Sequence, residues 1–122
     1  MPDCIFCKII KKEIPTDFIY EDDSLVVFND IKPAAPVHLL VVPKIHIPSI
    51  MQTEDSHKEI ISALVYTARD TAKKRGLTGY KLIFNVGKDG GQVIGHLHLH
   101  LLGGWTDIKS IESTEVTPHQ GP

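Results

Sequence analysis

The segment 95–104, GHLHLHLLGG, places a histidine at every second position and leucines between them. Successive side chains of a β-strand point to opposite faces, so His96, His98 and His100 should line one face at spacings of about 6–7 Å. The leucine face can then be buried in a core, which leaves a polar row of histidines suited to a site. Spacing alone leaves two alternatives open, a surface face that is merely rich in histidine and a metal clip.

The other elements are expected on both sides of one long helix. Apolar residues in 4–14 have the spacing of a short amphipathic helix, which Pro15 should stop. The long helix should begin at a capping box of Ser56 and Glu59 and end at the KKRG motif, 73–76. Its apolar stripe comprises Ile60, Ile61, Leu64, Val65, Ala68 and Ala72. Strands are expected over 18–22, 24–30, 37–43, 80–86 and 96–104.

This order predicts an α+β fold in a single domain, 1–122, with a five-stranded antiparallel sheet. Hydrophobic residues make up 42% of the chain and charged residues 23%. This composition allows a small hydrophobic core in a chain of this length. The tail from about residue 106 has no strong periodicity, and no element is assigned to it.

Composition excludes several functions. The net charge is −2 and no basic block is present, so we expect no nucleic-acid partner. No apolar run approaches the roughly 20 residues that span a bilayer, and the N-terminus lacks the layout of a signal peptide. A cytoplasmic protein without a membrane partner is therefore expected. In a reducing compartment, Cys4 and Cys7 favour a metal or redox pair over a disulfide.

Three segments together resemble the histidine triad family. They are IFCKIIKKEIP (5–15), FNDIKPAAPVHLLVVPKIHI (28–47) and NVGKDGGQVIGHLHLHLLGG (85–104), and only about the last 17 residues resist alignment. The short chain and its LLGG motif look most like the Hint branch, whose members are purine nucleoside phosphoramidases. The resemblance implies a homodimer whose two sheets join into one of ten strands, and a purine nucleotide bound at the end of the triad strand.

The resemblance also implies roles for the histidines. The middle histidine of the family, here His98, is the nucleophile that forms a nucleotidyl intermediate, and neutral imidazole suits this role. His100 would donate to a phosphate oxygen and stabilise the developing charge. His38 matches a position that supports the triad. An amine leaving group departs badly as an anion, so acid catalysis matters for a P–N bond.

A nucleotide pocket is implied by the same resemblance. Asp30 would accept from ribose hydroxyls, and Asn85 would reach the phosphate or the leaving group. Phe28 and Ile31 would wall the base, and the phosphate would be lined by Gly91, Gln92 and Val93, together with His98 and His100. Taken alone, Asp30 could be a turn residue, Asn85 a strand cap and Phe28 a core residue.

Two positions depart from many Hint-like sequences. Val93 stands where those proteins carry a hydroxyl, and Gly95 where they carry an aromatic residue. Losing a side-chain hydrogen bond to phosphate would cost about 1 kcal/mol. The departure puts the rate in doubt more than the reaction type.

A structural zinc site is a further implication of the resemblance. Some family members use a C-x-x-C pair, the histidine of a PKxHI-like segment and the first triad histidine, in a tetrahedral Cys2His2 site. The corresponding residues here are Cys4, Cys7, His46 and His96. The alternative is two reduced cysteines packed as small hydrophobic side chains and a surface histidine.

Three functions are therefore carried forward. The first is hydrolysis of purine nucleoside phosphoramidates, and the second is dinucleoside polyphosphate hydrolysis or nucleotidyl transfer by the same nucleophile. The third is a nucleotide-binding dimer that acts through partners with residual catalysis, which the valine at position 93 keeps open.

Overall fold

The computed structural model describes residues 4–114, which form a five-stranded antiparallel sheet with helices on both faces. The strand order is β1-β2-β3-β5-β4. The strands are β1 Tyr20–Glu21, β2 Leu25–Asn29, β3 Val37–Pro43, β4 Tyr80–Ile83 and β5 Leu99–Gly103. The α+β class and the five antiparallel strands are confirmed.

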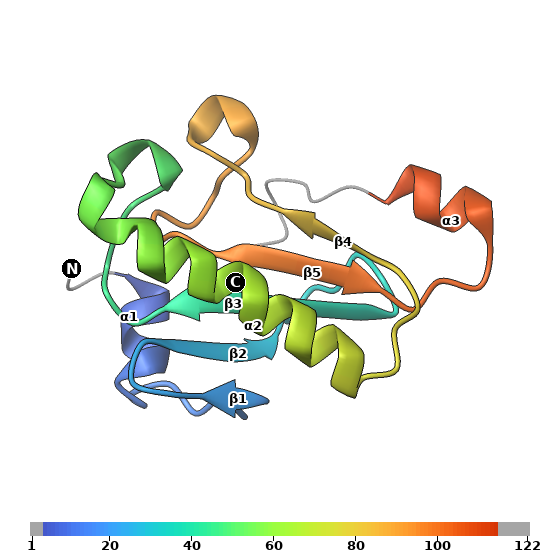
Figure 1. The fold of residues 1–122 in the computed structure, drawn as a ribbon, viewed down its shortest axis with the longest axis horizontal. Coiled ribbons are helices and arrows are strands. Elements are labelled where there is room, and N and C mark those ends of the chain that lie inside the picture. The colour runs from blue at the N-terminus through green and yellow to red at the C-terminus, as the bar shows by residue number, and fades with distance from the viewer. Residues whose placement is uncertain (1–3, 115–122) are drawn as a thin grey trace.

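Three α-helices accompany the sheet, namely α1 Ile5–Ile10, α2 Lys58–Lys74 and α3 Ile108–Ser113. The long helix α2 runs across one face of the sheet, and α3 lies at the opposite end of the molecule from α1 (Figure 1). Helix α3 falls in the tail to which the sequence assigned no element. Its start is fixed by Asp107, whose side chain accepts from the Ser110 amide at 2.7 Å.

Two apolar clusters lie on the two faces of the sheet. The α2 cluster comprises Leu25, Val27, Leu39, Val41, Ile47, Leu64, Ala68, Ala72, Leu97, Leu99 and Leu101. The α1 cluster comprises Phe6, Ile9, Val26, Phe28, Leu40 and Val42. Alternation along the strands sends the odd-numbered leucines of 97–101 to the first cluster, so the histidines between them face α1.

The pairing of β3 with β5 sets the histidine positions. In this antiparallel ladder His38 lies opposite Leu102, and Leu40 lies opposite His100. His38 and His100 are therefore diagonal neighbours on the same face, although they are 62 positions apart in sequence.

Helix α1 ends earlier than the position of Pro15 predicts. Its last residue is Ile10, and Lys12 takes a left-handed conformation with φ of 64°. The amides of Lys12 and Glu13 then turn back to the carbonyls of Ile9 and Lys8, at 3.0 and 2.9 Å. This Schellman pattern, usually built on glycine, closes the helix before Pro15 is reached, so the prediction that Pro15 stops it is wrong.

The start of α2 also differs from the predicted capping box of Ser56 and Glu59. A 3₁₀ turn, Asp55–His57, precedes the helix, and the capping box is formed by Glu54 and His57 instead. Here the Glu54 amide donates to His57 Nδ1 at 2.9 Å. A ring nitrogen of histidine accepts as an oxygen would, which the residue-type rule did not anticipate.

The apolar stripe of α2 is confirmed at its centre and shifted at its edge. Leu64, Ala68 and Ala72 are buried, but Val65 is 36% exposed. Thr71 is buried in its place, because its hydroxyl donates to the Thr67 carbonyl at 2.8 Å and so satisfies itself within the helix.

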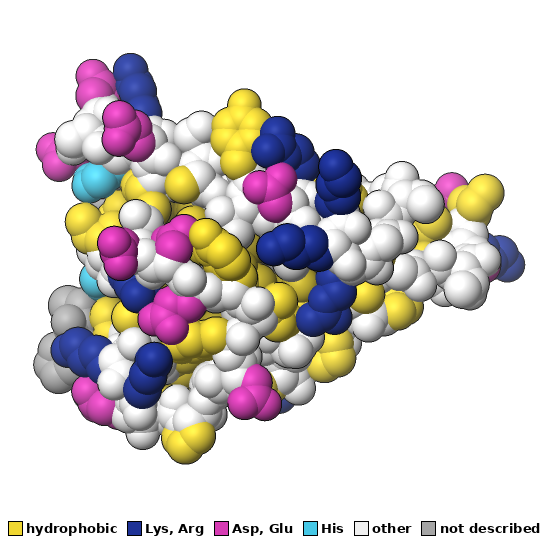
Figure 2. Space-filling model, turned by 60° about the horizontal axis from the view of Figure 1, so that its bottom comes forward, with side chains coloured by type: hydrophobic (Ala, Val, Ile, Leu, Met, Phe, Trp, Pro, Cys, Tyr) yellow, Lys and Arg dark blue, Asp and Glu magenta, His cyan; other side chains and the backbone are white. Residues whose placement is uncertain are grey.

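Acidic and basic side chains both occur on the face shown in Figure 2, and several Lys and Arg side chains gather to the right of its centre. None of the helices within residues 4–114 combines the length and the apolar character needed to cross a bilayer.

Candidate active site and adjoining metal-ligand cluster

The triad face is buried rather than left as an open polar row. His96, His98 and His100 are 0%, 9% and 3% exposed. Regular pairing of β5 begins only at Leu99, so His96 and His98 lie in the approach to the strand. There the Leu97 amide donates to the Ile47 carbonyl at 2.7 Å, which extends the alternation beyond the ladder.

The tautomer of His98 follows from its one backbone contact. Its Nδ1 lies 2.7 Å from the carbonyl oxygen of His96. A carbonyl only accepts, so Nδ1 carries the proton and Nε2 keeps a lone pair. Burial lowers the pKa of His98, against the raising effect of this hydrogen bond. The ring is thus held neutral, with a basic nitrogen available for attack on an electrophile.

His38 and His100 form a buried pair beside His98. His38 Nε2 lies 2.9 Å from His100 Nδ1, and the amide of Ala34 donates to His38 Nδ1 at 2.9 Å. Burial lowers the pKa of His38 to about 4 and that of His100 to about 3, with neighbouring histidines contributing. Both rings are therefore neutral near pH 7. The expected association of His38 with the triad is present in the structure.

Asp30 lies behind this pair. It is 6% exposed, its Oδ1 accepts from the Lys32 amide at 2.8 Å, and its Oδ2 lies 3.4 Å from His38 Nε2. Burial raises its pKa, while the Lys32 amide acts in the opposite direction. Asp30 is thus a turn residue, as one reading of the sequence allowed, and it also contacts the histidine network.

The glycine-rich loop is braced by its own polar groups. Gly91, at φ of 84°, donates from its amide to the Lys88 carbonyl, and the Gln92 amide donates to Gly87. The Gln92 side chain donates to the Pro48 and Ile94 carbonyls and accepts from the Gly87 amide. The amide of Val93 has no such partner within residues 4–114, and its side chain is 53% exposed.

Asn85, two residues after the end of β4, closes the same loop. Its Nδ2 donates to the Gly90 carbonyl at 2.9 Å, whereas its Oδ1 is buried and has no hydrogen-bond partner among the described residues. A β-carbon on Gly91 would come within 3.4 Å of that Nδ2, so a glycine keeps the contact free of crowding. A buried acceptor without a partner is costly unless something else supplies one.

The two residues expected to wall a base differ in exposure. Phe28 is 3% exposed and packs in the α1 cluster against Phe6, with ring centroids 5.6 Å apart. Ile31 is 69% exposed. Phe28 is therefore a core residue, and Ile31 is the one presented at the surface.

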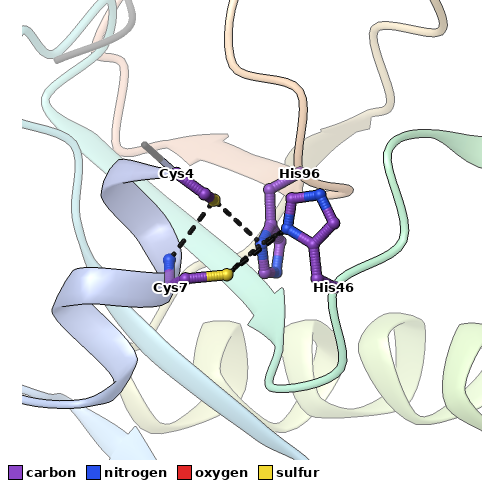
Figure 3. A group of neighbouring side chains, drawn as sticks. All are labelled: Cys4, Cys7, His46 and His96. Carbon is purple, nitrogen blue, oxygen red and sulfur yellow. Dashed lines mark hydrogen bonds between the residues drawn. The ribbon is translucent and has the colours of Figure 1, made fainter. Parts of the chain in front are cut away.

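Three further side chains converge on His96, the first histidine of the triad. Cys4, Cys7, His46 and His96 place their ligand atoms within 4.8 Å of one another (Figure 3). His96 Nδ1 lies 3.3 Å from Cys4 Sγ, 3.6 Å from Cys7 Sγ and 3.1 Å from His46 Nδ1. Tetrahedral zinc with ordinary Zn–N and Zn–S bonds separates its ligand atoms by about 3.3–3.8 Å. The distances from sulfur to His Nδ1, 3.3–3.6 Å, lie in that range, and the 3.1 Å between the two histidine nitrogens is slightly shorter, so small side-chain adjustments would let these residues hold one such ion.

Protonation agrees with this fit. His96 Nε2 lies 2.8 Å from the Pro43 carbonyl, to which it must donate, so Nδ1 faces the two sulfurs with a lone pair. Cys4 and Cys7 form no disulfide. Burial raises the pKa of Cys7, with Cys4 adding to the effect, and a cation bound there would act in the opposite direction by favouring the thiolates. This cluster can bind a metal such as zinc.

Comparison with known proteins decides the family. A family model described as "Scavenger mRNA decapping enzyme C-term binding" matches residues 3–113. Protein HitA of Neisseria gonorrhoeae is 46% identical over 104 residues, which cover 84% of this chain and 97% of that protein. The chain belongs to the histidine triad family.

Other histidine triad proteins also resemble this chain, in sequence and in structure. Purine nucleoside phosphoramidase of Escherichia coli K12 is 42% identical over 102 residues, covering 82% of this chain and 86% of that protein. A histidine triad protein from Clostridium difficile superposes with a TM-score of 0.84 at 44% identity, covering 88% and 96% of the two chains. A HIT family hydrolase from Legionella pneumophila gives 0.83 at 44%, covering 85% and 95%.

Some contacts of this histidine triad site were not foreseen. The Ala34 amide, the Pro43 carbonyl and the ring of Phe6 each touch a histidine of the site. The first two are backbone groups, which carry no residue-type signal. Phe6 stands between the two cysteines, and that position was the only available clue.

Proposed function

We propose that this histidine triad protein hydrolyses the P–N bond of purine nucleoside phosphoramidates through a covalent intermediate on His98. The observation that carries the proposal is the hydrogen bond from His98 Nδ1 to the His96 carbonyl, because it leaves Nε2 as a nucleophile. The relationship to a purine nucleoside phosphoramidase at 42% identity supports the choice of substrate.

The reaction takes two displacements. The lone pair of His98 Nε2 forms a bond to the α-phosphorus, and the P–N bond breaks with its electron pair going to nitrogen, which leaves as the amine after protonation. Water then attacks phosphorus, the bond to His98 breaks, and the nucleoside monophosphate departs as water gives up a proton. Imidazole is also a good leaving group from phosphorus, so the intermediate can be hydrolysed in the second step.

Charge on the phosphate would be stabilised by His100 and by the amide of Val93. His100 donates to a phosphate oxygen in this proposal, and Val93 adds a loop amide that donates to no other group within residues 4–114. Gly91 and Gln92 would line the phosphate by shape, since their amides are committed within the loop.

The leaving amine and the nucleoside would take the remaining positions. We assign the unpartnered Oδ1 of Asn85 to the N–H of the leaving amine, because a carbonyl oxygen cannot donate to phosphate. Asp30 would accept from a ribose hydroxyl through the carboxylate positions that Lys32 leaves free. Ile31 would cover the purine, with Phe28 supporting the wall from the core.

Zinc is the metal we propose for the cluster of Cys4, Cys7, His46 and His96. Bound there, it would supply a structural crosslink between α1 and the approach to β5, with no part in the bond-breaking steps. Free thiols at this position agree with a reducing, cytoplasmic setting.

A homodimer through β4 is also part of the proposal. This strand is one of the two edges of the sheet and is longer than β1 at the other edge, and its Tyr80 and Leu82 are each 37% exposed. Pairing two such edges would join two sheets into one of ten strands and cover those side chains. Light scattering of the wild type and of Leu82→Lys tests it: we expect a dimer that the lysine weakens, and a monomeric wild type refutes it.

Incubation with adenosine 5′-phosphoramidate tests the reaction. We expect the wild type to release AMP, and a rapidly quenched sample to carry an adenylyl group on the peptide containing residues 95–104. His98→Ala should bind AMP and stay folded but release none. Release at an unchanged rate by His98→Ala would refute the nucleophile.

The same assay separates the alternatives. The match to a scavenger decapping model keeps P–O–P cleavage as a second candidate, for which a dinucleoside polyphosphate would be consumed faster than the phosphoramidate. Tight AMP binding with no turnover of either compound would instead identify a nucleotide-binding module.

A further inference from the structure

The loop that joins β2 to β3 contacts the histidine pair through the amide of Ala34 as well as through the carboxylate of Asp30. Ala34, between Pro33 and Pro36, donates its N–H to Nδ1 of His38 at 2.9 Å. A ring nitrogen that accepts a hydrogen bond carries no proton, so the proton of neutral His38 is on Nε2. Two acceptors face that nitrogen, His100 Nδ1 at 2.9 Å and Asp30 Oδ2 at 3.4 Å, as an N–H there requires.

The tautomer of His38 determines the tautomer of His100. Because His38 Nε2 donates to His100 Nδ1, the proton of neutral His100 is on its own Nε2. His98, two residues away, has the opposite arrangement, with its proton on Nδ1. Neighbouring histidines of one strand segment thus present a donor at position 100 and a lone pair at position 98.

The same contacts leave no place for an added proton. A second proton on His38 would have to sit on Nδ1, where the Ala34 N–H already points. A second proton on His100 would meet the N–H of His38 in the same way. Both side chains are almost fully buried, at 2% and 3% exposure, so water cannot relieve the conflict. The lowered pKa values of the two rings agree with this geometry.

We propose that the Ala34 amide is a positioning group that sets the tautomer of His100 through His38, so that His100 donates a hydrogen bond to substrate but keeps its proton. In the reaction proposed above, the proton of the leaving amine then comes from a donor other than His100, and solvent water is always available. The tautomer assignment itself depends only on the contacts in the free protein.

Long-range ¹H–¹⁵N correlation spectra of histidine-labelled protein at pH 7 test the assignment without substrate. We expect His38 and His100 as single Nε2–H tautomers and His98 as the Nδ1–H tautomer. An Nδ1–H form, a mixture or a charged ring at His100 would overturn the proposal, whatever the variants do.

Proline substitutions then test Ala34 itself. Ala34→Pro removes the donor, and we expect His38 and His100 to become mixtures of tautomers while His98 is unchanged. Ala35→Pro is the matched control, because the Ala35 amide donates to no other group within residues 4–114, and it should keep the wild-type spectrum. A single, unchanged tautomer of His100 in a folded Ala34→Pro variant would show that the amide does not set it.

A second pair of variants serves if the proline disturbs folding. His38→Gln retains an N–H that can reach His100 Nδ1, so the wild-type tautomer of His100 should be preserved. His38→Leu offers no donor, so His100 should become a mixture of tautomers. Equal spectra of His100 in the two variants would contradict transmission through His38.

Kinetics separate this proposal from the proposed function. In a phosphoramidase, Ala34→Pro should lower kcat about tenfold and leave KM within twofold, because the misplaced proton affects the transition state most. An inactive wild type with the expected spectra would refute the proposed function and leave the positioning role standing. An active wild type whose histidines have other tautomers would refute the positioning role and leave the proposed function standing.

Discussion

Phe6 meets the nucleophile candidate His98 edge-on, with ring centroids 5.1 Å apart and ring planes at 90°. It contacts His96 in the same manner, at 5.8 Å, and is completely buried. Phe6 stands between Cys4 and Cys7 on α1, so the helix that carries the two thiols also supports the ring of His98. The metal-ligand cluster and the active site therefore share one wall.

Phe6→Leu should disturb that wall. We expect a loss of about 1–3 kcal/mol in unfolding free energy from the smaller side chain, together with a larger fall in kcat than in 1/KM because His98 gains rotational freedom. Urea unfolding and steady-state kinetics measure both. Ile9→Val is the control, because Ile9 is buried in the same cluster but has no aromatic ring to place against His98, and it should cost about 0.5–1.5 kcal/mol with kcat preserved. Equal losses of kcat would refute the coupling.

Metal removal should act on stability first. If the wild type binds one zinc ion per chain, a chelator should lower its melting temperature, since at 100 times the dissociation constant a ligand stabilises the fold by about 2.7 kcal/mol. Elemental analysis and thermal unfolding check this. Cys4→Ser should bind zinc more weakly and show a smaller chelator effect. A wild type that contains no metal after growth with zinc, and melts identically with chelator, would refute the site.

Acid should destabilise the fold through His38 and His100. Their folded pKa values are about 4 and about 3, below the 6.5 of an unfolded histidine. Between these values the unfolded chain binds more protons, so stability is fully present above about pH 6.5 and falls as the pH drops toward 4. Each histidine should contribute a slope on the order of 1 kcal/mol per pH unit. His38→Gln should reduce the slope of unfolding free energy between pH 6.5 and 4.5, and an unaltered slope would contradict the assignment.

Val93→Ser should raise the rate. The side chain is 53% exposed, so the change costs no core packing, and a hydroxyl there would add one hydrogen bond to the phosphate. A gain of about 1 kcal/mol corresponds to roughly fivefold in kcat/KM. Val93→Ala removes the isopropyl group without adding a donor and should give no such gain. Similar rates for the two variants would show that the hydroxyl is not used.

Side-chain patterns predicted the elements that have a continuous apolar run or a strong alternation. The seven residues 37–43 form β3 as expected, because one continuous apolar run carries the strand and Pro43 closes it. The leucines at positions 97, 99 and 101 all lie in the α2 cluster, because alternate residues of a strand point to the same face of the sheet. The four metal-ligand candidates, drawn from positions 4 to 96, lie together in the structure.

Backbone contacts account for what the patterns missed. The end of α1 depends on a left-handed lysine, and the start of α2 depends on a histidine acting as a cap, neither of which residue preferences favour. One missed contact is made by a side chain: Phe6 packs against His96 and His98, whereas side-chain periodicity places it only in a core. The amide of Ala34 could be located only once β3 had been paired with β5.

That pairing also makes the site a reporter of folding. A slip of one residue between β3 and β5 would turn His38 and His100 to opposite faces of the sheet, so only the native register brings them together. Local helix formation in α2 needs no contact across the 62 positions that separate the two histidines. During refolding, the helical signal should therefore return before the contact between His38 and His100 does. Recovery of that contact marks the moment at which β3 and β5 have paired in the native register.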